Sequence, residues 1–189
     1  AEALEAAGVQ VCFVMADDAA AKLVKSRDKK VRILHTRYDR MEEELPVLTA
    51  VMEEEHPDML LIDSYYVSDA YLERLTEQVW TAYIDDKSFH SYPVNMIINY
   101  NIYGDRSLYH PEPAYSLMGA AYAPLRPEFR NVEYHVREQA EAALLTTGGS
   151  DRYDLAGQIL RAVPEEIPVV FHVVSGIFNP HYDELCRMA

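Results

Sequence analysis

Polar side chains follow three of the strands that the sequence predicts, at the point where each strand ends. In open α/β sheets, ligands bind outside the carboxyl ends of the strands, so this is where a site is expected. Aspartate and asparagine at such positions can instead cap the next helix or close a turn, and both interpretations remain open. The residues concerned are Asp63 after residues 59–62, Asp85 and Asp86 after residues 79–84, and Asn99 and Asn101 after residues 94–99.

A second candidate is the turn Gly148-Gly149-Ser150, which contains the only Gly-Gly pair of the chain and precedes Asp151. Backbone without Cβ atoms can approach an anion closely, and the first N–H groups of a following helix favour negative charge. The turn would therefore suit a diphosphate. The pattern is neither G-x-G-x-x-G nor a P-loop with its lysine, so an ordinary turn between a strand and a helix remains the alternative.

Other kinds of chemistry find little support in the residue pattern. The seven histidines form no H-E-x-x-H motif and no His/Cys pair at metal spacing, so we expect neither a metal nor a cofactor. Ser64, Ser150 and Ser175 lie in no G-x-S-x-G motif, which disfavours a serine hydrolase. Cys12 and Cys186 have no C-x-x-C spacing and are expected to be buried, reduced thiols.

The composition limits the classes of partner. Among 189 residues, 17 Lys and Arg stand against 31 Asp and Glu, giving a formal charge of −14, which argues against nucleic-acid binding. The acidic triplets 42–44 and 53–55 are expected to be solvated. No apolar run approaches the roughly 18 residues of a membrane span, and the N-terminus lacks a basic signal region. We therefore expect a soluble, cytoplasmic protein with no membrane partner.

The elements that would position these residues alternate between strand and helix, which is typical of an open α/β sheet with helices on both faces. The expected strands cover 9–15, 31–35, 59–62, 79–84, 94–99, 142–147 and 169–174, and the expected helices cover 17–26, 42–55, 68–78, 151–163 and 180–188.

Residues 103–130 interrupt the alternation with four prolines and are interpreted as the end of a first domain and a connector. We thus predict a Rossmann-like N-terminal domain over residues 1–130 and the beginning of a second Rossmann-like domain over residues 131–189. The chain begins within a predicted helix. The second predicted domain contains only two strands, at 142–147 and 169–174, which are too few to form a hydrophobic core of their own. We expect further segments beyond both ends.

Several segments, taken in order, carry a resemblance to a known family. The sequence resembles the nucleotide-sugar hydrolases of pseudaminic acid biosynthesis and the related spore coat polysaccharide biosynthesis proteins. The segments are AEALEAAG at 1–8, LIDSYY at 61–66, YIDD at 83–86, INYNIY at 98–103, YAPLRPEF at 122–129 and TTGGSD at 146–151.

The resemblance implies a glycosyltransferase-B-like architecture of two Rossmann-like domains. It also implies metal-free hydrolysis of a UDP-linked diacetamido-trideoxy sugar by water, which releases the free sugar and UDP. By position, Tyr65 with Asp63 would face the sugar and the attacking water. Asn99 and Asn101 would line the N-terminal side of the cleft, and the turn at 148–150 would lie near the diphosphate.

The chain also departs from the family pattern. Family members have a glycine-rich loop ending in Gly-His before the helix that residues 1–7 match, and that histidine is the expected base or water-orienting group. Neither this loop nor the later uridine-binding strands occur within residues 1–189. We therefore expect the parent protein to be the enzyme and residues 1–189 alone to be inactive. The alternatives are a glycosyltransferase that uses a nucleotide sugar, an inactive binding or partner protein of a sugar pathway, and an α/β domain unrelated to sugars.

Overall fold

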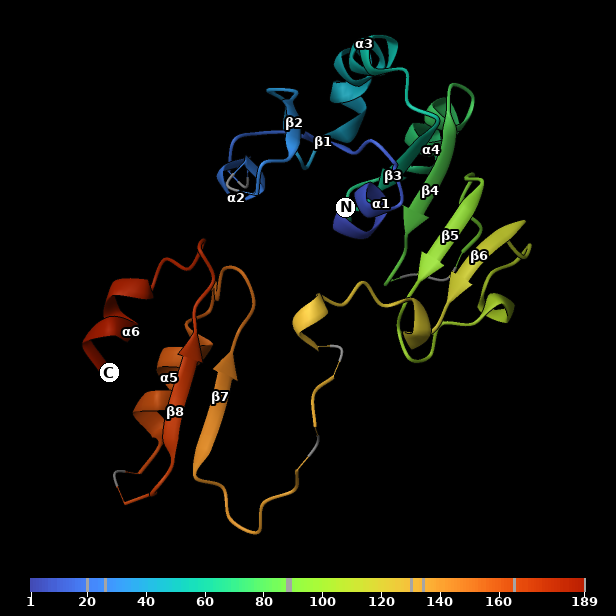
Figure 1. Ribbon diagram of the computed structural model, residues 1–189. Coiled ribbons are helices and arrows are strands. Elements are labelled where there is room, and N and C mark those ends of the chain that lie inside the picture. The colour runs from blue at the N-terminus through green and yellow to red at the C-terminus, as the bar shows by residue number, and fades with distance from the viewer. Residues whose placement is uncertain are drawn as a thin grey trace. The chain divides into compact units, whose positions relative to one another are not determined.

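The chain folds into two compact units, Ala1–Pro127 and Glu128–Ala189 (Figure 1). The computed structural model describes residues 1–19, 21–25, 27–87, 90–129, 131–133, 135–164 and 166–188. Two predicted boundaries, the helix end at Ser26 and the domain end at Arg130, lie outside the described residues. Each unit is described by itself below.

The first unit contains two separate parallel sheets. The smaller sheet pairs β1 with β2, and the larger has the order β3-β4-β5-β6 with every neighbouring pair parallel. This confirms a mixed α/β fold with parallel sheets, which is compatible with a Rossmann-like fold. The strands are β1 Cys12–Met15, β2 Lys30–Ile33, β3 Met59–Ile62, β4 Trp80–Ile84, β5 Met96–Asn99 and β6 Tyr115–Met118.

The first unit ends within the segment 103–130, where the end of the first domain was expected, but the sequence prediction missed strand β6 in this segment, which pairs with β5 (Met96↔Tyr115). The nearest prolines, Pro111 and Pro113, precede the strand, so every residue of β6 keeps its N–H group for the ladder. Strict alternation also fails, since among the described residues only loops connect β4 to β5, and the short 3₁₀ helix η2, Arg106–Leu108, lies between β5 and β6.

The helices of the first unit bear out the periodicity of the sequence. Leu48, Val51 and Met52 of α3 are buried together, and α3 ends at His56 in the left-handed conformation, directly before Pro57. The Ser68 hydroxyl accepts a hydrogen bond from the Tyr71 N–H and so caps α4. The helices are α1 Glu2–Ala6, α2 Ala21–Lys25, η1 Met41–Glu44, α3 Leu45–Glu55 and α4 Asp69–Thr76.

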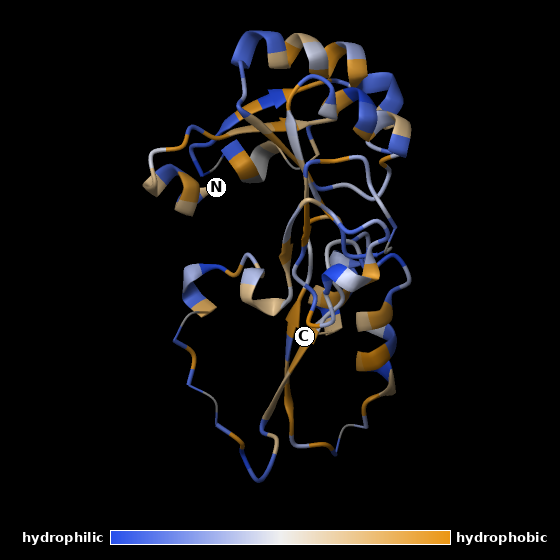
Figure 2. Ribbon diagram, turned by 90° about the vertical axis from the view of Figure 1, so that its right-hand side faces the viewer, coloured by the Kyte–Doolittle hydropathy of each residue, from blue (hydrophilic) through white to orange (hydrophobic). Residues whose placement is uncertain are grey.

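One apolar core joins α3 and α4 to the larger sheet. Leu72, Leu75 and Ile97 are almost fully enclosed in it, and so are Tyr71 and Tyr109. The four strands of the larger sheet are largely apolar, whereas α3 and α4 carry both apolar and polar residues (Figure 2). The helices therefore cover the sheet with one face and meet solvent with the other.

The acidic triplets are not simply solvated, in contrast to the prediction. Glu54 and Glu55 form ion pairs with Arg32, and Glu55 also pairs with Lys30, so the end of α3 is tied to β2. Glu44 is only 6% exposed. It accepts a hydrogen bond of 2.6 Å from the hydroxyl of Tyr71. Burial raises the pKa of Glu44, although this hydrogen bond acts in the opposite direction.

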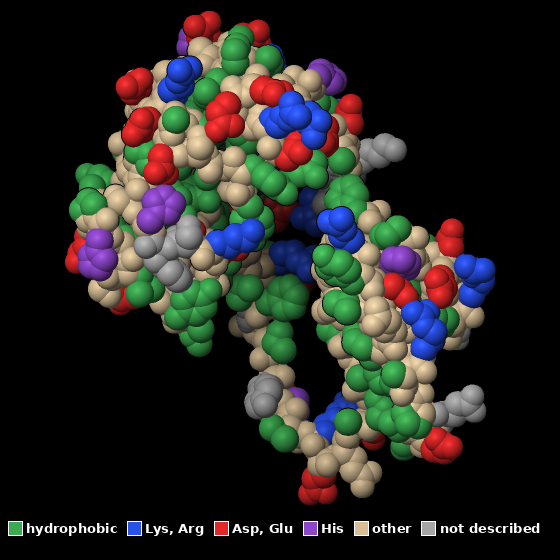
Figure 3. All heavy atoms as spheres, turned by 180° about the vertical axis from the view of Figure 1, so that it is seen from behind, with side chains coloured by type: hydrophobic (Ala, Val, Ile, Leu, Met, Phe, Trp, Pro, Cys, Tyr) green, Lys and Arg blue, Asp and Glu red, His purple; other side chains and the backbone are tan. Residues whose placement is uncertain are grey.

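The second unit has one two-stranded parallel sheet with two helices. Leu144 and Val174 are exposed, Ala156 and Leu185 are buried, and hydrophobic side chains are visible on the surface of this unit (Figure 3). The elements are β7 Ala142–Thr146, α5 Leu155–Ala162, β8 Val170–Val174 and α6 Tyr182–Met188. In the part of the chain that is described, no helix is long and apolar enough to cross a membrane.

The buried Glu44 predicts a pH-dependent stability. A carboxyl group whose folded pKa is raised stabilises the fold most below the unfolded pKa of glutamate, about 4.3, and loses this contribution as pH rises through the folded pKa. Glu44→Gln removes the charge and can still accept from Tyr71. We expect the variant to gain stability relative to the wild type as pH rises from 4 to 8.

The free energy of unfolding is measured by urea denaturation, followed by the fluorescence of Trp80, the single tryptophan, which lies in the first unit. Glu43→Gln is the control, because Glu43 is exposed in the same 3₁₀ helix. A constant difference between Glu44→Gln and the wild type across the pH range would contradict the prediction.

Candidate functional site

The parallel register brings the predicted polar residues to one edge of the larger sheet. Ile62 is paired with Tyr83 and Ile84 with Ile98, so β3, β4 and β5 end side by side. The residues that directly follow these ends therefore share the carboxyl edge, as expected for a parallel sheet. They form an inner, buried group and an outer, exposed group.

The inner group is centred on Asp85, which is 1% exposed. Its carboxylate accepts hydrogen bonds from the hydroxyls of Tyr92 (3.2 Å) and Tyr109 (3.0 Å) and from the backbone N–H of Lys87 (3.2 Å). A buried carboxylate is tolerated when its oxygens are satisfied in this way. Asp85 thus links β4 to the segment before β6.

Asn99 continues this buried network from the end of β5. It is fully buried, and its Nδ2 donates to the Tyr109 hydroxyl at 3.0 Å. Its Oδ1 accepts from the backbone N–H and the Nδ2 of Asn101, at 3.1 and 3.0 Å. A Cβ atom on Gly104 would overlap the carbonyl of Asn99. Asn99 therefore positions Asn101, and of the two amides only Asn101 is partly exposed.

The outer group is centred on Tyr65, whose side chain is 58% exposed. Its hydroxyl donates to Asp86 Oδ2 at 2.8 Å, and the Nζ of Lys87 lies 3.6 Å from its ring centroid. The hydrogen bond to Asp86 raises the pKa of Tyr65, with a further contribution from the charge of Asp63. Tyr65 therefore remains protonated and oriented at neutral pH.

Asp63 supplies a titratable carboxyl beside Tyr65. Desolvation at the end of β3 raises the pKa of Asp63, and the negative charge of Asp86 raises it further. Desolvation likewise raises the pKa of Tyr100, with smaller contributions from both carboxylates. A carboxyl that keeps its proton to higher pH than usual is suited to general acid-base chemistry.

In the second unit, the turn at Gly148-Gly149-Ser150 differs from its prediction in one respect. The predicted helix begins at Leu155 rather than at Asp151, and the Asp151 carboxylate accepts from the N–H groups of Leu155 (2.8 Å) and Ala156 (3.0 Å). Burial opposes ionisation, but these N–H groups lower the pKa of Asp151. The expectation that these helix N–H groups are free for an anion was wrong.

The two glycines of this turn occur in different structural environments. Gly148 has a φ of +78°, which favours glycine. Gly149 lies against Gly176 of the loop after β8, where a Cβ on Gly176 would overlap the backbone of Gly149. The Gly149 carbonyl also accepts from the Phe178 N–H at 3.2 Å. The turn itself is exposed and its contact with a diphosphate stays a prediction.

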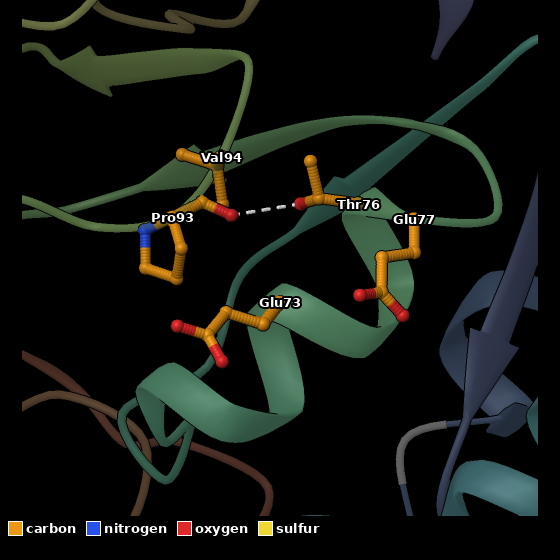
Figure 4. A pocket seen from close by; sticks show the side chains of 5 residues that line it. All are labelled: Glu73, Thr76, Glu77, Pro93 and Val94. Atoms are coloured by element: carbon orange, nitrogen blue, oxygen red, sulfur yellow. Dashed lines mark hydrogen bonds between the residues drawn. The ribbon is translucent and has the colours of Figure 1, made fainter.

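Two surface hollows lie away from the carboxyl edge. One, of about 370 Å³, is formed by the end of α4 and the residues before β5, and a hydrogen bond of 2.8 Å from the Thr76 hydroxyl to the Pro93 carbonyl lies in its wall (Figure 4). The other, of about 440 Å³, lies between the end of α3 and the residue before β4. Both are at the amino ends of the strands, and neither contains a predicted site residue.

Three participants in the carboxyl-edge cluster, Tyr92, Tyr109 and Lys87, were not found from the sequence. Tyr109 lies two residues before Pro111 in the segment interpreted as a connector, and no spacing relates it to Asp85. Lys87 directly follows Asp85-Asp86, but the pattern gave no reason to place it over Tyr65. No protein-family model and no curated protein matches this chain.

The buried network predicts a stability cost for Tyr109→Phe. The change leaves Asp85 and Asn99 each without one hydrogen-bond partner in a site closed to water, which costs about 1–3 kcal/mol. This loss of stability is measured by urea denaturation, with Trp80 fluorescence as the signal of unfolding. Tyr122→Phe removes an exposed hydroxyl in the same unit and serves as control. Equal unfolding midpoints for the two variants would contradict the prediction.

The contact between the two loops predicts that Gly176→Ala is destabilising. Its new methyl group would collide with backbone rather than with a movable side chain, so the loops must separate. We expect this to lower the free energy of unfolding by about 1–3 kcal/mol. Faster hydrogen exchange of the β7 and β8 amides would show this loss. Gly149→Ala is the matched control, because a Cβ there meets open space. Unchanged exchange in Gly176→Ala would refute the steric argument.

Proposed function

We propose that this chain is part of an enzyme that hydrolyses a UDP-linked diacetamido-trideoxy sugar to the free sugar and UDP. The observation that carries the proposal is the exposed Tyr65, held by Asp86 at the carboxyl edge of a parallel sheet beside the titratable Asp63. The proposal includes a glycosyltransferase-B-like architecture, a cytoplasmic location and a small-molecule substrate with no nucleic-acid partner.

The chemistry of the cluster supports a sugar ligand. Tyr65 offers an exposed aromatic face and a hydroxyl, a combination suited to a ligand that has both apolar and polar surface. Asp63 and Asn101 offer carboxylate and amide groups that bond to sugar hydroxyls and acetamido N–H groups. A group that accepts or donates a proton next to these contacts is what hydrolysis by water requires.

The leaving diphosphate is assigned to the exposed turn Gly148-Gly149-Ser150 in the second unit. The support is limited to the open space where Cβ atoms of the two glycines would lie, because the N–H groups of Leu155 and Ala156 are bound to Asp151. In a chain with a formal charge of −14, an anion must be held by such local groups.

The test is hydrolysis of the UDP-linked sugar by the full-length gene product, because the family's Gly-His loop does not occur in residues 1–189. Tyr65→Phe should lower kcat by about 10- to 100-fold through loss of the oriented hydroxyl. The free energy of unfolding should change by less than about 1 kcal/mol, since the hydroxyl is exposed.

Tyr115→Phe is the matched control, since it removes an equally exposed hydroxyl at the opposite end of the sheet. Unchanged turnover in Tyr65→Phe would remove Tyr65 from the site. Transfer of the sugar to an acceptor without hydrolysis would indicate a glycosyltransferase, and binding without turnover would indicate a partner protein. Hydrolysis by residues 1–189 alone would contradict the assignment of the base to the Gly-His loop.

A further inference from the structure

Two consecutive residues that follow the next strand, Asp86 and Lys87, hold the exposed side chain of Tyr65. Its hydroxyl bonds to Asp86 at 2.8 Å, and the ammonium group of Lys87 lies over its ring at 3.6 Å. An exposed tyrosine ordinarily turns freely between rotamers. Here the hydrogen bond to Asp86 restrains the hydroxyl group, and the contact with Lys87 restrains the face of the ring.

The support for this arrangement comes from the buried layer below. Asp85 precedes Asp86 and Lys87 in the chain, and its carboxylate accepts from the backbone N–H of Lys87. The same carboxylate is held by Tyr109, which is itself bound to Asn99. The backbone that presents Asp86 and Lys87 is therefore anchored to a fully enclosed hydrogen-bond network.

We infer that Asp86 and Lys87 are positioning residues that orient Tyr65 so that its hydroxyl oxygen accepts a hydrogen bond from the substrate or from the attacking water. The reason is the direction of the existing bond. The hydroxyl proton is directed to Asp86, which leaves the lone pairs of the oxygen for a donor in the site. The inference rests on the proposed function.

This direction also defines the chemical class of the recognised group. A hydroxyl, an acetamido N–H or a water molecule can donate to the Tyr65 oxygen, whereas a carboxylate or phosphate cannot. Asp63 and Asp86 add negative charge that would repel an anion at this point, and Lys87 is engaged over the ring. The first unit is thus suited to the donor-rich sugar rather than to the diphosphate.

The first experiment follows the titration of Tyr65 by NMR with ¹³Cζ-labelled tyrosine. The Tyr65 signal is assigned by its loss in Tyr65→Phe. The groups whose charges act on Tyr65 are Asp63, Asp86, Lys87 and Tyr100. Asp86→Asn removes the carboxylate that favours the protonated phenol, so the Tyr65 pKa should fall relative to the wild type.

The control is Asp58→Asn, which removes a carboxylate that precedes β3, at the other end of the same strand. It should leave the Tyr65 titration unchanged. A Tyr65 pKa that is the same in Asp86→Asn and in the wild type would overturn the positioning role. This readout requires no sugar and no turnover.

The second experiment measures hydrolysis of the UDP-linked sugar by the full-length gene product. In Asp86→Asn the amide can donate to the Tyr65 oxygen and reverse the bond, so kcat should fall roughly tenfold with a smaller change in KM. Lys87→Met keeps the aliphatic stem and removes the charge, and kcat should fall about two- to fivefold. Asp58→Asn should have wild-type kinetics.

The two experiments separate the inference from the function on which it rests. A lowered Tyr65 pKa in Asp86→Asn, in a protein that hydrolyses no UDP-sugar, would support the orientation and refute the proposed function. Hydrolysis that depends on Tyr65 but is unaffected by Asp86→Asn, with an unchanged Tyr65 pKa, would support the function and refute the positioning role.

Discussion

The hydrogen bonds of the buried Asp85 are the constraint on which the candidate site depends. A carboxylate that is 1% exposed must be satisfied by donors, and two tyrosine hydroxyls and a backbone N–H meet this requirement. Through Tyr109 the network reaches Asn99 at the end of β5, so one buried charge fixes the loops after two neighbouring strands. This buried network therefore determines the positions of the exposed residues.

Nearby hydrogen-bond donors or basic side chains contact several acidic side chains of this chain. Glu44 and Asp151 are buried carboxylates like Asp85, and hydroxyl or backbone N–H donors contact each of them. At the end of α3, by contrast, Glu54 and Glu55 pair with basic side chains. Buried charge of this kind specifies geometry more than it adds stability, because desolvation offsets much of the gain. The fold therefore uses its carboxylates to orient loops.

Periodicity predicted both the strand at 59–62 and the helix that carries Leu48, Val51 and Met52. The helix buries these residues on one face as predicted, whereas β3 is an edge strand of its sheet and leaves Met59 and Leu61 exposed. Strand β6 was missed because prolines surround it, and Tyr109 because its partner Asp85 is distant in sequence. Such contacts depend on tertiary packing, which no local spacing encodes. The shared edge of Asp63, Asp86 and Asn101 followed from parallel topology alone.

The division of the carboxyl edge into a buried layer and an exposed layer explains why consecutive residues have different roles. Asp85 and Asn99 are buried and each makes at least three hydrogen bonds through its side chain, whereas Asp86 and Asn101 are partly exposed at the same edge as Tyr65. The proposed binding of a sugar and a water molecule in fixed geometry would need such a rigid support, since displacement of a reacting group by about 1 Å can cost roughly 100-fold in rate. The enclosed network supplies the rigidity, and Tyr65 supplies the exposed contact.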